Sequence, residues 1–542
     1  MSLNNRDLKV LIADDSRLVT NSISAMLKKI GVKDIKCVYK PLEVLGACKH
    51  DNFDLIICDY NFQTQLNGFQ IMEELKYHKY LPAQTTFVFL TGENDLKIVR
   101  SIIDSEPDDY LLKPFSQEFF QTRLRSAMKR RASLVRIHEE LSNANYEGAV
   151  TACDELLPLN PNYSTLIRRY KAYALVQSKQ FARARDEYEQ LLKEDNFDWI
   201  KTSLANTLIE TNELDKAKEV LDSIKRKDDN PYYHDEMSRL AVEHEDIPKA
   251  IEHLKLSAML LDAGAERELV IANLSLAKES YDDAVTYIKR YYEKNINTYR
   301  GGIFTKLNYV RYFLYRALFA PGIYNFDNLL VGLKPFISEI ERSDELKTQS
   351  DLISAHIALI KGDLKSAFTS VKQALKADNL THFYDQYHLC VLLERCSYMK
   401  DVKLLLPVAR ATISEAQHPS ILRSQVHMLK SLEESFLASQ KEIARIKEHL
   451  AGQKSIAAAE ISSHFDHYFQ LHDLLPNSAR ICLAIIKLAA IRPFNYQGDY
   501  HILNKIEACN KVMESLYGRD QLGTMEYHSM YDKAKKNIRK VV

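Results

Sequence analysis

Residues 53–59 read FDLIICD, an almost continuous apolar run of strand length that ends in an aspartate. An apolar run without alternation is typical of a strand in a parallel sheet, because helices cover both faces of such a sheet and bury both sides of the strand. Segments with apolar residues at helical spacing separate such runs, so residues 1–128 predict an α/β domain with a doubly wound, five-stranded parallel sheet. The four other runs of strand length are LKVLIAD (8–14), DIKCVYK (34–40), TTFVFLT (85–91) and DDYLLK (108–113).

The composition of the whole chain favours helix elsewhere and argues against several functions. Its 542 residues include only 15 glycines and 14 prolines, which excludes a large all-β architecture. Basic and acidic residues number 73 each, so no net charge attracts nucleic acid or an anionic membrane. The apolar stretch at 481–491 is shorter than the roughly 20 residues that span a bilayer, so no membrane insertion is expected. Eight cysteines without a CxxC pair predict neither zinc nor a disulfide framework, and they favour a cytoplasmic location.

A repeat with a period near 34 residues begins close to residue 130. In the last four of the five repeats, a second small residue stands twelve positions before the marker alanine, which lets two antiparallel helices approach closely. The register resembles the tetratricopeptide repeat (TPR). The predicted divisions are about five TPR repeats at 129–298, an irregular helical connection at 299–349, further TPR-like pairs at 350–416, and a C-terminal helical region of unassigned register at 417–542. The alanines that mark the repeat are Ala149, Ala184, Ala217, Ala250 and Ala284.

Polar residues follow the strands of the first domain at the point where each strand ends. Ligands bind outside the carboxyl ends of strands in an open parallel sheet, so these side chains should converge. Carboxylates about 4 Å apart repel by roughly 4 kcal/mol per pair at an effective dielectric of 20, and Mg²⁺ is the natural cation to offset that repulsion. A lysine suits a phosphoryl oxygen, and the set fits in-line phosphoryl transfer to a carboxylate. The residues are Asp14, Asp15, Asp59, Thr91 and Lys113.

The segments LIADDS, IICDYN, FVFLTGE and DDYLLKPF resemble, in order and spacing, the CheY-like receiver domain of bacterial two-component response regulators, which has a flavodoxin-like fold. The resemblance implies that Asp59 accepts the phosphoryl group, with Thr91 and Lys113 assisting. It implies that Mg²⁺ is bound by Asp14, Asp15, Asp59 and the backbone carbonyl of Asn61.

The same resemblance implies a switch pair, Thr91 and Tyr110, in which the hydroxyl moves to the phosphoryl group and the ring follows inward. Asn61 and Glu93 resemble the combination in chemotaxis-type receivers that lose phosphate quickly, and Lys113–Pro114 resembles the family's cis peptide. The segments YNFQTQLNG (60–68) and SEPDD (105–109) depart from the family pattern on faces that contact partners.

The first helix of each repeat should line a concave groove. The residues expected on it form a polar strip suited to an extended peptide, and the alternative is that they are ordinary solvated side chains. The candidate groove residues are Arg169, Tyr173, Asn206, Arg239 and Asn273.

Together these features predict a response regulator that is phosphorylated on Asp59 by a sensor histidine kinase or a phosphotransfer protein, with output through protein binding by the TPR region. Beyond its own phosphorylation and dephosphorylation it is not expected to be an enzyme, and no nucleic-acid partner is expected. The alternative is a constitutive TPR scaffold that uses the receiver for dimerisation or as a phosphate sink. The kinase, the TPR ligand, the direction of the switch and a possible homodimer stay open.

Overall fold

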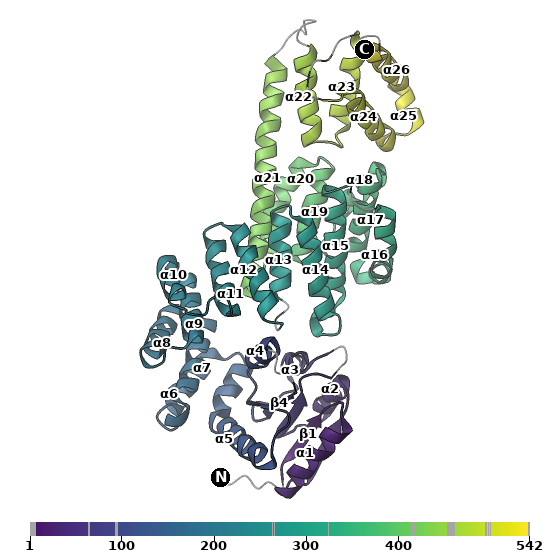
Figure 1. Cartoon of the computed structure of the whole chain (residues 1–542). Helices are drawn as coiled ribbons and strands as arrows, with labels where there is room; N and C mark the ends of the chain where they lie inside the picture. Colours follow the sequence, from purple (N-terminus) through teal and green to yellow (C-terminus); the bar gives the residue numbers. More distant parts are fainter. Residues whose placement is uncertain are drawn as a thin grey trace. The chain divides into compact units, whose positions relative to one another are not determined.

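The computed structural model describes residues 7–62, 66–92, 96–262, 264, 266–322, 325–414, 418–452, 461–493, 496, 498 and 500–539. They fall into two compact units. Unit 1 comprises Met1–Glu268 and Glu293–Gly301, and unit 2 comprises Leu269–Tyr292 and Gly302–Val542. Figure 1 gives the order of the elements.

Unit 1 begins with a five-stranded parallel sheet in the order β2-β1-β3-β4-β5, which confirms the predicted fold class. The strands are β1 (Lys9–Ala13), β2 (Asp34–Val38), β3 (Leu55–Asp59), β4 (Thr86–Thr91) and β5 (Asp109–Leu112). The helices that connect and follow them are α1 (Arg17–Lys29), α2 (Pro41–His50), α3 (Gly68–Tyr77), α4 (Leu96–Asp104) and α5 (Gln117–Ser142).

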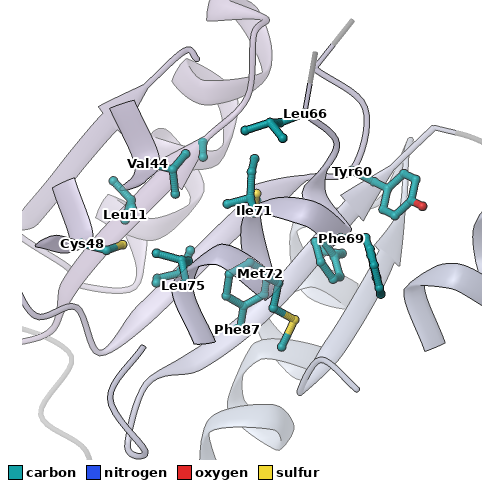
Figure 2. Packing of buried hydrophobic residues seen from close by; sticks show 14 of the residues in the cluster. Leu11, Val44, Cys48, Tyr60, Leu66, Phe69, Ile71, Met72, Leu75 and Phe87 are labelled. Atoms are coloured by element: carbon teal, nitrogen blue, oxygen red, sulfur yellow. The ribbon is translucent and has the colours of Figure 1, made fainter. Parts of the chain in front are cut away.

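Alternate residues of the central strands supply two cores, one on each face of the sheet. Val10, Ile57 and Val88 pack with residues of α1 and α5. Leu11 and Phe87 belong to the other core, to which α2 and α3 contribute (Figure 2). Because both faces are covered, the central strands are apolar throughout, and the polar residues are left for the strand ends.

Helix α5 joins the receiver-like domain to the helical repeats without a linker. It runs for 26 residues, so the boundary predicted at residue 128 lies inside a single helix. The helices after it in the repeats are α6 (Tyr146–Leu156), α7 (Ser164–Gln177), α8 (Phe181–Glu194), α9 (Asp198–Glu210), α10 (Leu214–Asp222), α11 (Pro231–Glu243), α12 (Ile247–Leu260), α13 (Glu266–Ala277) and α14 (Tyr281–Asn295).

The predicted repeat register is visible in the helix turns as well as in the core. All five marker alanines are buried, and five residues before each of them stands a residue with a left-handed backbone. The same turn precedes Ala367 and Val402, where the sequence indicated a return of the pattern. The left-handed residues are Ala144, Lys179, Asn212, Glu245, Glu279, Gly362 and Ser397, with φ between 54° and 83°.

Unit 2 is helical. The segment 299–349, predicted to be an irregular helical connection, contains two α-helices that belong to this unit. These are α15 (Ile303–Phe319) and α16 (Phe326–Glu341). The rest are α17 (Lys347–Lys361), α18 (Leu364–Ala374), α19 (Phe383–Arg395), α20 (Met399–Ala411), α21 (Pro419–Gly452), α22 (Ile461–Leu474), α23 (Ala479–Ile491), α24 (Ile502–Leu516), α25 (Arg519–Thr524) and α26 (Tyr527–Arg539). Among the described helices, none combines the length and apolar character that crossing a membrane requires.

Candidate phosphoacceptor site

The sheet brings together the polar residues that follow its strands. Asp14 and Asp15 follow β1, Asp59 ends β3, Thr91 ends β4 and Lys113 follows β5. One carboxylate oxygen from each of the three aspartates lies within 4.8 Å of the others. Asp14 and Asp59 are buried, whereas Asp15 is exposed, so the cluster opens to solvent on the side of Asp15.

Lys113 reaches the two buried carboxylates from the end of β5. Its Nζ donates to Asp14 Oδ2 at 2.7 Å and to Asp59 Oδ1 at 3.0 Å. Its backbone N–H donates to the Thr91 carbonyl at 2.7 Å, and the Lys113–Pro114 peptide is cis, as the resemblance implies. One cation therefore faces three carboxylates, and the site keeps an excess of negative charge that a divalent metal ion would offset.

The pKa of Asp59 reflects its burial and the charges around it. Burial raises the pKa of Asp59 to about 6; Lys113 acts to lower it, and the charges of Asp14 and Asp15 raise it further. Burial alone would lower the pKa of Lys113, but the hydrogen bond to Asp14 and the charge of Asp59 raise it overall. Asp59 is thus a carboxylate whose charge is poorly compensated within the protein.

The loop after Asp59 is held close to the site by a glycine. Gly68 N donates to the Tyr60 carbonyl at 2.7 Å, and a Cβ at residue 68 would lie 2.7 Å from the Asp59 carbonyl oxygen. Only glycine therefore fits where α3 begins against the end of β3. Asn61 is exposed within this loop, where its backbone carbonyl was predicted to bind the metal.

The proposed switch residues occupy different environments. Thr91 is buried at the end of β4. Tyr110 is partly buried and packs against the core that β4 and α3 share. Glu93, the second residue expected to tune phosphate loss, lies outside the described residues.

The segment SEPDD, which departs from the family pattern, contacts the helices that follow the receiver-like domain. Glu106, with a φ of 54°, forms an ion pair with Arg169 of α7. Asp109 accepts a hydrogen bond from Arg123 Nε at 2.8 Å, and Asp108 lies 3.5 Å from Arg131 Nη1. The segment therefore ties β5 both to α5 and to the first repeats.

A cavity of about 320 Å³ lies at this contact. Tyr110, Glu106, His138, Arg169 and Tyr170 are among the residues that line it. Burial lowers the pKa of His138 to about 3, with the charge of a nearby arginine adding to the effect. The expected switch tyrosine thus borders a space shared with the repeats.

Helix α4 also contacts the repeats, through the chain that follows α12. Leu261 is buried in the core that contains Tyr60 and Ile102. Lys97 Nζ lies 3.1 Å from a carboxylate oxygen of Asp262. This contact could not be predicted from the sequence, because a lone Leu-Asp pair after a helix carries no recognisable signal.

A second contact that the sequence analysis missed involves residues 294–301 and α3. Arg300 makes two 3.0 Å hydrogen bonds with the carboxylate of Glu73, and Tyr299 stacks on Tyr77 with ring centroids 3.8 Å apart. The Tyr299 N–H donates to the Glu74 carboxylate at 2.6 Å. The available signal was NINTYRGGIF, which interrupts the repeat pattern at this point.

The residues predicted to line one open groove differ in their exposure and in their contacts. Arg169 lies over the ring of Trp199 as well as pairing with Glu106, and Tyr173 is 46% exposed. Asn206 and Arg239 both contact the carboxylate of Glu236.

Asn273 contradicts the groove prediction. It is fully buried, donating to Ser424 Oγ at 2.8 Å and to Tyr384 OH at 3.0 Å, and Tyr312 donates to its carbonyl oxygen. Residues of α15, α19 and α21 thus cover the position at which a peptide was expected.

Comparison with known proteins assigns a class to each of the first two regions. The model of the response regulator receiver domain matches residues 10–125, and a tetratricopeptide repeat model matches residues 175–240. Residues 10–125 are therefore a response regulator receiver domain, in agreement with the sheet order and the strand-end site. A TPR region follows it in the same chain.

Several response regulators are similar to this chain. The response regulator protein PmrA of Pseudomonas aeruginosa is 27% identical over 188 residues, which are 34% of this chain and 80% of PmrA. The sensory transduction protein LytT of Bacillus anthracis is 31% identical over 144 residues, 26% of this chain and 54% of LytT. The probable transcriptional regulator ycf27 of Porphyridium aerugineum is 26% identical over 22% of this chain and 48% of its own length. The chain thus spans about half the length of the last two.

Among solved structures, the chemotaxis response regulator CheY4 of Vibrio cholerae is 24% identical, with 22% of this chain and 98% of CheY4 covered and a TM-score of 0.21. The receiver domain of the Francisella response regulator 1452 is 26% identical, with 23% and 98% covered and a TM-score of 0.21.

Proposed function

We propose that this chain is a response regulator that is phosphorylated on Asp59 in a Mg²⁺-dependent reaction and that signals through protein binding by its TPR region. The observation that carries the proposal is the convergence of Asp14, Asp15, Asp59, Thr91 and Lys113 at one edge of the sheet. A sensor histidine kinase or a phosphotransfer protein would supply the phosphoryl group, since the sequence contains no glycine-rich phosphate cradle of the P-loop type.

The residues at the site fit Mg²⁺, which prefers oxygen ligands. Asp14, Asp15, Asp59 and the carbonyl of Asn61 would hold it, and the bound ion would supply positive charge that stabilises the transferring phosphoryl group. Asp59 offers a carboxylate oxygen as the nucleophile. Lys113 is placed to stabilise a phosphoryl oxygen on the same carboxylate, and the Thr91 hydroxyl would bind another.

Contacts between the receiver and the repeats support a direct route for the signal. In the proposed switch, Thr91 and Tyr110 move inward on phosphorylation and rearrange α4 and the segment before β5. In this chain that segment holds Glu106, which pairs with Arg169, and α4 holds Lys97, which pairs with Asp262. A coupling of about 1–3 kcal/mol, which corresponds to a change of roughly 5- to 150-fold, is typical of such linkage.

Protein binding is the favoured output because the region after the receiver is built from TPR repeats. The relatives whose names describe transcription share only part of their length with this chain. The chain's balanced charge also gives no support to nucleic-acid binding.

Intact mass tests the chemistry. Incubated with acetyl phosphate and Mg²⁺, the full-length protein should gain one phosphoryl group, and Asp59→Asn should gain none. Asp51→Asn is the matched control, because Asp51 is a carboxylate that pairs with Lys9 and Lys36 at the surface of the same domain. Absence of phosphorylation in the wild type, or its persistence in Asp59→Asn, would contradict the proposal.

Hydrogen exchange tests the coupling. Beryllofluoride, which mimics the phosphoryl group, should change amide exchange in α7 and around Asp262 in the wild type and leave Asp59→Asn unchanged. A receiver that responds while α7 and residues near 262 do not would favour the constitutive scaffold instead. A pull-down that compares the wild type with Asp59→Asn, each after treatment with acetyl phosphate and Mg²⁺, would identify the partner.

A further inference from the structure

Two cysteines and a histidine gather in the core of the last helices of unit 2. His472 lies on α22, Cys482 on α23 and Cys509 on α24. One ligand atom from each lies within 4.8 Å of the others. The two thiols are fully buried, and His472 is 7% exposed. Three separate helices therefore present three metal-binding groups to one interior point.

The histidine distinguishes this cluster from ordinary core packing. Neither ring nitrogen of His472 has a hydrogen-bond partner outside this cluster among the described residues. Three other buried histidines each have a partner for one ring nitrogen: His356 and His388 contact each other, and His234 contacts His253, each at 3.0 Å between ring nitrogens. A buried polar group without a partner destabilises the folded state, so a ligand for the His472 ring would stabilise it.

The spacing of the three groups is close to that of a zinc site. Bonds of about 2.3 Å to sulfur and about 2.0 Å to nitrogen place tetrahedral ligand atoms roughly 3.5–3.8 Å apart. The present separations, all within 4.8 Å, exceed this by about 1.3 Å at most, which side-chain rotation can close. Thiolate and imidazole ligands also select Zn²⁺ or another thiophilic ion over Mg²⁺.

We propose that His472, Cys482 and Cys509 form a structural site for a thiophilic metal ion, with Zn²⁺ as the expected occupant, that joins α22, α23 and α24. Binding replaces the two thiol protons by bonds to the metal and gives one ring nitrogen of His472 a partner. The fourth position of a tetrahedral ion falls to a water molecule. Because the site is buried, its role is to stabilise the helices rather than to bind a substrate.

Sequence reasoning argued against zinc because it sought ligands close together in the chain. Here the gaps are 10 and 27 residues, and each ligand comes from a different helix. Short ligand spacings belong to sites built on one loop or hairpin, whereas a site between packed helices is set by tertiary structure alone. Only the structure could reveal it.

Cobalt spectroscopy on the reduced, chelator-stripped full-length protein tests the site. One equivalent of Co²⁺ should produce a thiolate-to-cobalt charge-transfer band, and Zn²⁺ should abolish that band. Cys482→Ser, Cys509→Ser and His472→Gln should each weaken Co²⁺ binding at least tenfold. Cys396→Ser is the matched control, because Cys396 is another buried thiol of unit 2 outside the cluster.

The thiolate band separates this site from the receiver, because oxygen ligands give no such band. Asp59→Asn should therefore show a thiolate band of the same intensity as the wild type, whatever Co²⁺ the receiver binds. Hydrogen exchange on stripped wild type, before and after Zn²⁺, needs no substitution: Zn²⁺ should slow exchange in α22, α23 and α24. The proposal is overturned if the wild type shows no thiolate band. A mass two hydrogens lower that a reductant restores, with Cys482 and Cys509 as the bonded pair, would overturn it equally.

Discussion

The receiver site and the interior of unit 2 both bury charged side chains, but they balance them differently. At the strand ends, three carboxylates face one lysine and the cluster opens toward solvent at Asp15. In unit 2, Arg311 pairs with Asp385, both at most 2% exposed, and Gln349 donates to the same carboxylate at 3.0 Å. The strand-end cluster keeps a net negative charge that a cation can bind, whereas the Arg311–Asp385 pair has no net charge.

This difference in net charge is what distinguishes a ligand-binding site from a buried pair with a structural role. A cluster with uncompensated charge is destabilised in the isolated protein and gains from a bound cation, as functional sites often do. A neutral buried pair gains nothing from a ligand and loses a great deal when it is broken. Removing one charged residue should therefore have opposite effects in the two places.

Breaking the pair in unit 2 is expected to have the largest effect. Arg311→Met leaves Asp385 buried without its cation, and such a loss costs about 3–5 kcal/mol. Hydrogen exchange of α15 and α19 in the full-length protein would measure the change. Arg311→Met with Asp385→Leu is the control, because removing both charges should recover most of the loss; a single variant as stable as the wild type would contradict the neutral-pair description.

Removing a carboxylate from the receiver should have the opposite sign. Folding raises the pKa of Asp59 from 3.8 to about 6, so the ionised form disfavours the folded state at pH 7. Without divalent ions, Asp59→Asn should stabilise the receiver by up to about 3 kcal/mol at pH 7, and this advantage should shrink as pH falls from 6 to 4.

Exchange of the amides of β3, in EDTA and then in Mg²⁺, would measure the effect of Asp59→Asn. Mg²⁺ should protect the wild type more than the variant, because the variant lacks one ligand. Asp51→Asn serves again as the control. Destabilisation by Asp59→Asn in EDTA would mean that the three carboxylates are compensated without a metal ion.

The contrast also explains what could be predicted from the sequence. The convergence of Asp14, Asp59 and Lys113 could be predicted because each lies at or just after the end of a strand, and parallel strands bring their carboxyl ends to one edge. The alanines of the repeats were identified because close packing admits only small residues. Asn273 was misjudged because the repeat register marks the face of a helix but not which later helix covers that face.

No sequence rule of this kind marks the contacts between the receiver and the repeats. None marks the cluster around His472 either. Leu261 and Arg300 are ordinary residues in a helical chain, and their partners are far away in sequence. Prediction therefore succeeded where a local rule fixes the position of a residue. It failed where only tertiary packing does.

The buried histidine pair of unit 2, His356 and His388, should make its stability depend on pH. Burial, with the charge of Arg311 adding to it, lowers the pKa of His356 to about 3, and it lowers the pKa of His388 in the same way. Below pH 6.5 the unfolded chain binds protons that the folded chain does not, so stability falls as pH falls from 6.5 toward 3. Between pH 7 and pH 5 the loss through His356 is about 2 kcal/mol, and His388 adds a loss of the same sign.

His356→Gln should reduce the loss of stability between pH 7 and pH 5 by about 2 kcal/mol, measured by hydrogen exchange of α17 and α19 at the two pH values. His50→Gln, at an exposed position in unit 1, is the control. If His356→Gln leaves the slope of stability against pH unchanged, the histidine pair is charged or solvated in the folded protein.

The smallest effect is expected at the contact between the receiver and α7. Glu106 and Arg169 are both more than 40% exposed in their side chains, so the part of the Arg169→Ala loss that comes from this ion pair should be only about 0.2–1 kcal/mol, and less at high salt. A double-mutant cycle with Glu106→Gln, read by hydrogen exchange of α7, would isolate the pair from the contact of Arg169 with Trp199. A coupling energy well above 1 kcal/mol would mean that the contact is permanent. A weak contact is what a switch requires, because phosphorylation that contributes about 1–3 kcal/mol can break only a contact of similar or smaller strength.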